Sequence, residues 1–239
     1  KLLRVFFLYS FFLSPHILTV EIDVDGVLDE KEWSQAKEIT KYYESLPFTL
    51  NDASGSQKVL VLEDEDGIYF GFINFQDEET IRVQKHQRDD EMANADMVGV
   101  SIDFDGDGLL SYGFSISAGG SILDNVVRNE NEVNYDWDSD WGHGVSIGKD
   151  VWYAEMFIPW SVAPMKAQKG DKRRVRLSFY RWIVSKYKVH STIKGNAMTE
   201  KFMSIFNEYE FNNYDVSKID YFPYVNLSED RILEEDRTK

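Results

Sequence analysis

The chain has 239 residues, of which 43% are hydrophobic and 15% aromatic, enough to bury the core of one large all-β domain or of two small ones. Its formal net charge is −16, so phosphate backbones and anionic lipid headgroups would repel it, and we exclude nucleic acid as a partner. The sequence contains no cysteine, which excludes disulfides, zinc–thiolate sites, iron–sulfur clusters and cysteine nucleophiles.

Residues 1–18 have the proportions of a signal peptide. A short basic region, Lys1–Arg4, precedes the apolar run Val5–Leu13, and charged sequence begins at Glu21. A membrane-spanning helix needs about 20 apolar residues, so this run is too short to cross a bilayer. The alternative is a buried N-terminal strand or helix. We expect an exported protein and leave residues 1–18 out of the predicted fold.

After residue 19 the strand signals dominate. Apolar and polar residues alternate with period two in several short runs, and Asp-Gly or Gly-Lys-Asp turns separate two pairs of them. The predicted strands are Lys58–Glu63, Ile68–Phe75, Met97–Asp103, Ser111–Ser117, Gly144–Ile147, Val151–Ile158 and Val175–Ile183.

Helical signals are few. Asp29–Ala36 begins with an N-cap candidate, Asp29, and acidic first-turn residues, and Glu78–Arg82 is long enough for a single turn. We therefore predict one all-β domain over residues 19–226, an antiparallel β-sandwich of immunoglobulin or jelly-roll type with one or two short helices. Residues 227–239 are almost wholly charged and are predicted to be a charged tail.

One loop has the spacing of a cation site. Asp103, Asp105 and Asp107 alternate with Phe104 and glycines, and carboxylates at alternate positions of a tight loop can converge on calcium. The twelfth position of an EF-hand would be glutamate, but here it is Phe114, so the loop is not an EF-hand. We predict calcium at these three aspartates, with an ordinary acidic hairpin turn as the alternative.

Tryptophans are the candidate ligand contacts. In the run from Tyr135 to Trp141, aspartates alternate with Trp137, Ser139 and Trp141. This pattern suggests a metal site, aromatic platforms for a sugar, or a strand with tryptophan inward and aspartate in solvent. Exposed aromatic rings stack on the CH faces of sugars, although a core position is commoner for tryptophan. The predicted ligand contacts are Trp137, Trp141 and Trp182, whereas the predicted core tryptophans are Trp33, Trp152 and Trp160.

Signals for catalysis are weak. The four histidines stand alone in the sequence, and the nucleophile-elbow, phosphate-loop and dinucleotide-binding motifs are missing. With 42 acidic residues, a carboxylate pair of glycosidase type carries no information. We therefore predict a binding protein rather than an enzyme.

Four segments in order resemble the family 9 carbohydrate-binding modules. The segment Val24–Ala36 is similar to the family's opening I-D-G-x-L-D-E-x-x-W-x-x-A, and Val59–Phe75 is similar to its first hairpin. Asp96–Asp103 resembles the D-x-V-x-V-x-x-D strand, with Tyr112–Phe114 in its hairpin partner, and Trp152–Trp160 resembles the W-x-x-E-x-x-I-P strand. The resemblance implies the sandwich fold and a non-catalytic module that recognises carbohydrate.

A branch of this family, in which the module precedes an outer-membrane β-barrel of unknown function, is similar at two further places. These are Tyr180-Arg181-Trp182 and the segment Ile219–Val225, which resembles the entry to the barrel. This likeness implies a location in the periplasm, outer membrane or cell surface of a Gram-negative bacterium, and a barrel as a possible partner. One alternative is therefore a structural or interaction domain attached to such a barrel, without sugar binding. A haem-binding relative is the other.

The sequence departs from the family where sugar-binding members hold their ligand. One of their two sandwiching tryptophans lies three residues before the aspartate of the D-x-V strand, and this chain has Ala93 there. Their arginine on the following strand has no counterpart near Phe114. The resemblance therefore implies the fold and the calcium loop, but it does not transfer the sugar-binding residues.

Overall fold

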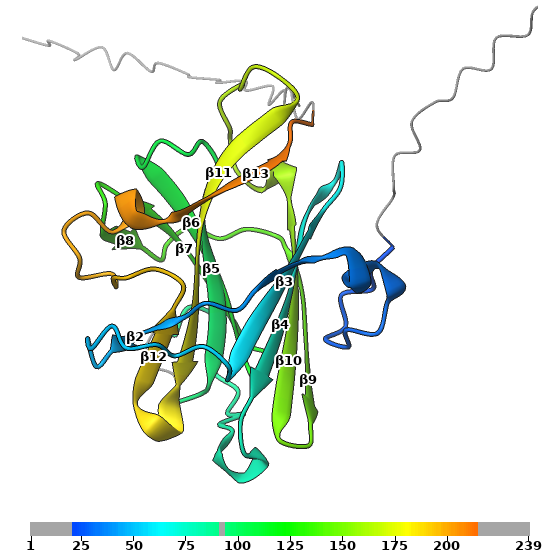
Figure 1. Ribbon diagram of the computed structural model, residues 1–239, viewed down its shortest axis with the longest axis vertical. Coiled ribbons are helices and arrows are strands. Elements are labelled where there is room, and N and C mark those ends of the chain that lie inside the picture. The colour runs from blue at the N-terminus through cyan, green and yellow to red at the C-terminus, as the bar shows by residue number, and fades with distance from the viewer. Residues whose placement is uncertain (1–20, 91–93, 215–239) are drawn as a thin grey trace, which may run out of the picture.

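A computed structural model describes residues 21–90 and 94–214 of the chain (Figure 1). The predicted signal-like segment 1–18, the charged tail 227–239 and Ala93 lie outside the described residues. The described residues form two antiparallel sheets. The first has five strands in the order β1 (Lys37–Ile39), β3 (Gln57–Glu63), β4 (Gly67–Phe75), β10 (Val151–Pro159) and β9 (Gly142–Gly148).

The second sheet has eight strands and is organised around one long strand, β11 (Lys172–Ile183). One edge of β11 pairs with β5 along Arg176–Trp182. Its other edge is shared, because residues 172–177 pair with β13 and residues 180–183 pair with β12. The remaining strands of the sheet are β2 (Tyr43–Leu46), β12 (Lys188–Ser191), β5 (Met97–Asp103), β6 (Leu110–Ser117), β7 (Ile122–Arg128), β8 (Glu132–Asn134) and β13 (Asn207–Asn212).

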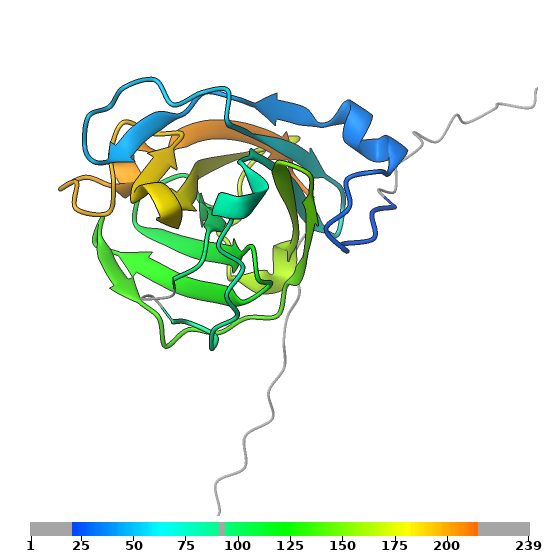
Figure 2. The same cartoon turned by 90° about the horizontal axis from the view of Figure 1, so that it is seen from below.

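The predicted hairpins are confirmed. Strands β3 and β4 pair around the Asp-Gly turn, β5 pairs with β6, and β9 pairs with β10 around residues 148–151. Figure 2 shows how the two sheets curl around a common interior. The predicted all-β sandwich is therefore the observed architecture, because alternating apolar residues give each sheet one face to bury against the other.

The predicted N-terminal helix is shorter than expected and is of the 3-10 type. The segment predicted as a helix at Asp29–Ala36 is a 3-10 turn, η1 (Lys31–Gln35), whose N-cap residue is Glu30 and not Asp29. The Glu30 carboxylate makes no cap bond, because it accepts hydrogen bonds from the Trp33 indole and the Asp23 amide instead. The other helical turns within the described ranges are η2 (Glu78–Thr80), η3 (Trp160–Val162), η4 (Val184–Lys186) and η5 (Met203–Ile205).

Aromatic side chains from both sheets meet in the core. Phe70 and Phe72 on β4 contact Phe179 on β11 edge to face, with ring centroids 5.5 and 6.1 Å apart. Each of these rings is almost fully buried, and burial of one such side chain stabilises the fold by about 1.5–3 kcal/mol. Trp33, Trp152 and Trp160 are 7%, 0% and 3% exposed, so their predicted core positions are confirmed. No helix within residues 21–90 and 94–214 has the length and hydropathy to cross a membrane.

Two of the sequence motifs meet at Glu155 on β10. Its carboxylate, 1% exposed with the rest of the residue, accepts hydrogen bonds from the Gly26 amide at 2.7 Å, the Asp25 amide at 3.0 Å and the Trp33 indole at 3.1 Å. Gly26 has a φ of +91°, and a Cβ there would lie 2.4 Å from the Val145 backbone, so only glycine fits. The N-terminal segment is therefore fastened to the first sheet, and burial raises the pKa of Glu155 to about 7.

Candidate functional site: the outer face of the second sheet

Strand β11 presents different chemistry on its two sides. Phe179, Arg181 and Ile183 are buried on the inner side, at 0%, 1% and 3% exposure. Tyr180 and Trp182 alternate with them and are partly exposed, which places them on the outer side. The motif Tyr180-Arg181-Trp182 therefore contributes two aromatic rings to the outer face and one guanidinium to the interior.

Tyr180 lies across the neighbouring strand β5. Its hydroxyl donates a hydrogen bond to Ser115 Oγ on β6 at 2.7 Å, so the ring spans the position of Gly99 between them. A Cβ at Gly99 would lie 2.4 Å from Tyr180 Cε1, which explains glycine in the middle of a strand. Burial raises the pKa of Tyr180, which therefore stays a neutral hydrogen-bond donor.

Trp182 is the predicted ligand contact whose ring lies beside an exposed aromatic residue. It is half-buried and faces Tyr187, in the turn between β11 and β12, with ring centroids 5.4 Å apart and planes at 70°. Tyr187 is 70% exposed. The two rings form a corner at the end of the outer face, where an apolar surface borders solvent.

Trp137 and Trp141 lie elsewhere and pack against the core. Trp141 is 8% exposed and packs edge to face against Phe114, 5.6 Å between centroids. Trp137 is half-buried and contacts Tyr112 and Phe114 at 4.9 and 5.9 Å. The aspartates between them are exposed, as in the interpretation with tryptophan inward and aspartate in solvent, although this segment is not a strand. Both rings pack against the core, whereas Trp182 faces the exposed ring of Tyr187, so we carry Trp182 forward and not these two.

Behind the outer face, Arg181 joins the two sheets. Its guanidinium donates to the carbonyl oxygens of Ser56 and Phe75 at 2.6 and 3.2 Å, and to the side-chain oxygens of Gln57 and Gln76 at 3.3 and 2.7 Å. Burial lowers the pKa of Arg181 to about 10, which leaves it protonated at neutral pH. The strand that carries Trp182 is therefore fixed to the ends of β3 and β4.

Asp96 holds the loops beside the same site. Its carboxylate is fully buried and accepts hydrogen bonds from the Val184 amide at 2.8 Å, the Gln76 side chain at 2.7 Å and the Arg82 amide at 3.1 Å. Val184 begins the turn η4 that leads to Tyr187. The aspartate of the D-x-V motif therefore positions that turn relative to β4 and β5.

The carboxylates of the predicted calcium loop each have partners within the protein. Asp103 accepts from the Gly106 and Gly108 amides, both at 2.8 Å, and Asp105 accepts from the Lys166 amide at 2.8 Å. Asp107 pairs with the Lys166 ammonium at 2.6 Å, which lowers the pKa of that carboxyl. These oxygens close a hairpin turn and neutralise a lysine, so in this arrangement they do not fit a shared ion. The calcium assignment stays a prediction.

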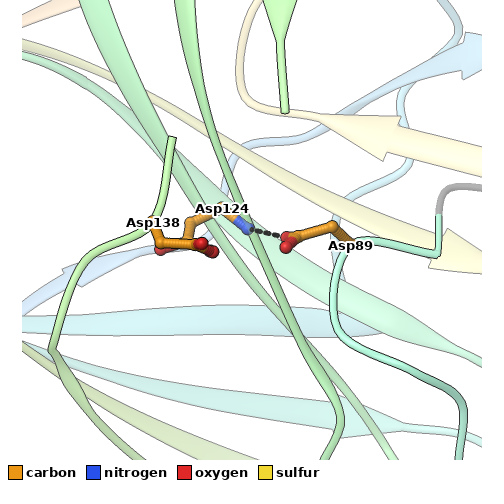
Figure 3. Close-up of side chains that lie close together, drawn as sticks. All are labelled: Asp89, Asp124 and Asp138. Carbon is orange, nitrogen blue, oxygen red and sulfur yellow. Dashed lines mark hydrogen bonds between the residues drawn. The ribbon is translucent and has the colours of Figure 1, made fainter. Parts of the chain in front are cut away.

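A different acidic group comes together on the inner side of β7, as Figure 3 shows. Oxygens of Asp89, Asp124 and Asp138 lie within 4.8 Å of one another, which is close enough for a metal ion. Arg88 occupies this group, donating to both oxygens of Asp124 at 2.7 and 2.8 Å and lying 2.9 Å from Asp138. The Asp124 amide also donates to Asp89. The Arg88 guanidinium therefore takes the place of a metal ion, and the cluster connects two loops to β7.

Known structures share this architecture. A family 9 carbohydrate-binding module from Caldicellulosiruptor kristjanssonii, in complex with cellotriose, superposes with a TM-score of 0.55 over 85% of this chain and 96% of its own, at 10% identity. The same kind of module in complex with glucose gives 0.53 over 84% and 96%, at 13% identity. The fold is that of the family 9 carbohydrate-binding modules.

A Bacteroides uniformis protein, described as a candidate carbohydrate-binding protein, superposes with a TM-score of 0.58 over 75% of this chain and 88% of its own, at 12% identity. No family model and no curated protein matches the sequence. At such identities the likeness is one of fold, and the ligand contacts have to come from this chain's own residues.

Sequence reasoning missed two residues of this outer face. Tyr180 could have been found, because period-two alternation puts it on the same side of β11 as Trp182. Tyr187 follows Ser185 and Lys186 in a short turn, where no periodicity signals which way a ring points. Only the hairpin geometry brings it to Trp182.

Proposed function

We propose that the chain is a non-catalytic module that binds carbohydrate on the outer face of its second sheet, at Trp182. The observation that carries this proposal is the accessible aromatic corner at Trp182 on a fold whose solved neighbours include modules in complex with cellotriose and glucose. Those neighbours are binding modules, which supports a binding role for this chain as well.

The chemistry of the outer face suits a sugar. Pyranose rings have apolar CH faces that stack on aromatic side chains and hydroxyl groups that need hydrogen-bond partners. Trp182 offers the ring, and Tyr180, two residues before it on the same strand, adds a second aromatic side chain to this face. The buried Arg181 behind Trp182 keeps this surface rigid, and rigid placement of the contact residues reduces the entropy lost on binding.

Titration calorimetry of Trp182→Ala against soluble sugars tests the proposal. With cellotriose, glucose and a soluble glycan array as probes, we expect wild-type protein to bind at least one sugar. Trp182→Ala should lower that affinity at least tenfold, about 1.4 kcal/mol, because it removes the stacking surface. The matched control is Trp141→Phe, which should reduce stability by about 0.5–3 kcal/mol and leave affinity unchanged, since Trp141 is in the core. A wild-type protein silent on every glycan would exclude carbohydrate binding.

Calcium at Asp103, Asp105 and Asp107 remains part of the proposal on sequence grounds. A bound ion would require the Lys166 ammonium to leave Asp107. Because an ion bound only to the folded state stabilises it, we expect EDTA to lower the thermal midpoint if calcium binds there. An unchanged midpoint would assign the three aspartates to an ordinary hairpin turn.

Export and attachment to an outer-membrane barrel also belong to the proposal. They rest on the signal-like segment 1–18 and on the resemblance of Tyr180–Trp182 and Ile219–Val225 to the barrel-linked branch. Fractionation of cells that produce the natural protein tests both, since an exported module reaches the periplasm or outer membrane. Recovery only from the cytoplasm would contradict export.

A further inference from the structure

The turn between β11 and β12 holds an aromatic residue in a costly conformation. Tyr187 has φ of 50° and ψ of 49°, the left-handed region. A side chain with a Cβ is destabilised there, and glycine or asparagine is the usual choice. The Tyr187 amide donates to the Val184 carbonyl at 3.0 Å, a bond that any residue would make.

The Tyr187 side chain contributes little to the stability of the fold. It is 70% exposed, so most of its ring is not buried against other residues. Its ring contact is with Trp182, which is itself half-buried on the outer face. Strained backbone of this kind persists where the surrounding structure holds it, and it is found preferentially at ligand-binding sites.

The position of the turn is held from inside the protein. The buried Asp96 carboxylate accepts a hydrogen bond from the Val184 amide. It also accepts hydrogen bonds from the Gln76 side chain and the Arg82 amide. On the other side of the turn, the Lys188 ammonium pairs with Glu44 on β2. Both ends of the turn are therefore anchored, and the exposed ring of Tyr187 is presented at a defined place.

We propose that Tyr187 is a second ligand-contacting residue, which holds a sugar ring together with Trp182. This inference rests on the proposed function. The two ring planes meet at 70°, so one ring can stack on the CH face of a sugar while the other contacts its edge. Two rings at this angle cannot both lie flat on a planar surface, which is why soluble glycans are the appropriate probes.

Tyr187→Gly separates a binding role from a structural one, because the two predict opposite changes. Glycine adopts the left-handed conformation without strain, so the thermal midpoint should stay the same or rise by about 2 °C. Affinity for the glycan that wild-type protein binds best on a soluble array containing cellotriose and glucose should fall at least fivefold. Tyr187→Phe keeps the ring and should bind within about twofold of wild type.

Asn129→Gly is the matched control, since Asn129 is also exposed with a left-handed backbone, at a φ of 48°, and carries no ring. It should leave glycan affinity unchanged. If wild-type protein binds a glycan and Tyr187→Gly binds it equally well, the inference is wrong while the proposed function stands. If wild-type protein binds none of the glycans, both the inference and the proposed function are wrong. A loss of affinity with a lower midpoint would point to a structural role for Tyr187 and would also overturn the inference.

Discussion

The inner and outer sides of β11 differ in what they contribute to the protein. On the inner side, Arg181 is buried and its hydrogen bonds reach both β3 and β4. On the outer side, Tyr180 and Trp182 form an aromatic surface that solvent can reach. Adjacent residues of one motif therefore have separate tasks, because successive side chains of a strand point to opposite faces.

This contrast implies that substitutions on the two sides should have separable effects. Inner-side changes should lower stability, since they leave buried polar groups without partners. Outer-side changes should alter binding at little cost in stability, since the groups they remove border water. Substitutions of Arg181, His190 and Tyr180 test this division.

Arg181→Met should lower the free energy of unfolding by about 3–5 kcal/mol, because two buried and two part-buried acceptors lose the hydrogen bonds of the guanidinium. Urea denaturation measures the loss. Arg174→Met is the matched control on the same strand. Arg174 is exposed and lies 3.9 Å from Glu208, so its loss should cost less than about 0.5 kcal/mol. Equal effects of the two substitutions would contradict the division between the two sides.

His190 on β12 should make the inner side sensitive to acid. Burial and the nearby Arg181 charge lower the pKa of His190 from 6.5 to about 4. The unfolded chain therefore binds more protons between these values, and stability is lost as the pH falls from about 6.5 through 4. We expect this loss to be about 1–2 kcal/mol.

NMR titration of the His190 ring should give a pKa near 4, and His190→Gln should remove this part of the acid destabilisation. The reference must be wild-type protein over the same pH range, because Glu155 acts in the opposite direction. Its pKa is raised to about 7, so its contribution is present below pH 4.5 and is lost as the pH rises towards 7. A His190 ring that titrates at 6.5 would show that the inner side is open to water.

Tyr180→Phe should have the smallest effect. It removes the hydrogen bond to Ser115, which is worth about 0.5–1.5 kcal/mol, and keeps the ring above Gly99. Adding Ser115→Ala should recover part of that loss, because the 2%-exposed hydroxyl no longer lacks a partner. Thermal melts of the two single variants and the double variant measure the coupling. Additive losses would place Tyr180 and Ser115 on independent parts of the face.

Much of the fold could be predicted because its signals are local. The Asp-Gly turn with alternating strands on either side identified the β3–β4 hairpin, and period-two patterns identified β5, β6 and β10. The longer strands β7 and β13 were not predicted, and neither were the short strands β1, β2, β8 and β12. The short strands have three or four residues each, which is too short for alternation to stand out, and long-range pairing defines them.

The candidate site was predicted in part. Trp182 lies on an accessible face, whereas Trp137 and Trp141 pack against Phe114, and the sequence marked all three alike. The Asp103 loop has the residue types of a calcium site, but its hydrogen bonds come from backbone amides and Lys166. Residue type and spacing do not reveal which groups pair with the carboxylate oxygens, since a partner such as Lys166 is distant in sequence.

The class of the fold, the main hairpins, the core tryptophans and the alternation of Tyr180, Arg181 and Trp182 along one strand could all be predicted from the amino-acid sequence. These features follow from turn chemistry and side-chain periodicity, which act over a few residues. Only the tertiary structure decided which side of β11 faces solvent and that Tyr187 meets Trp182. Those outcomes depend on how the two sheets cover each other and on Asp96, which anchors a turn 88 residues away in the chain.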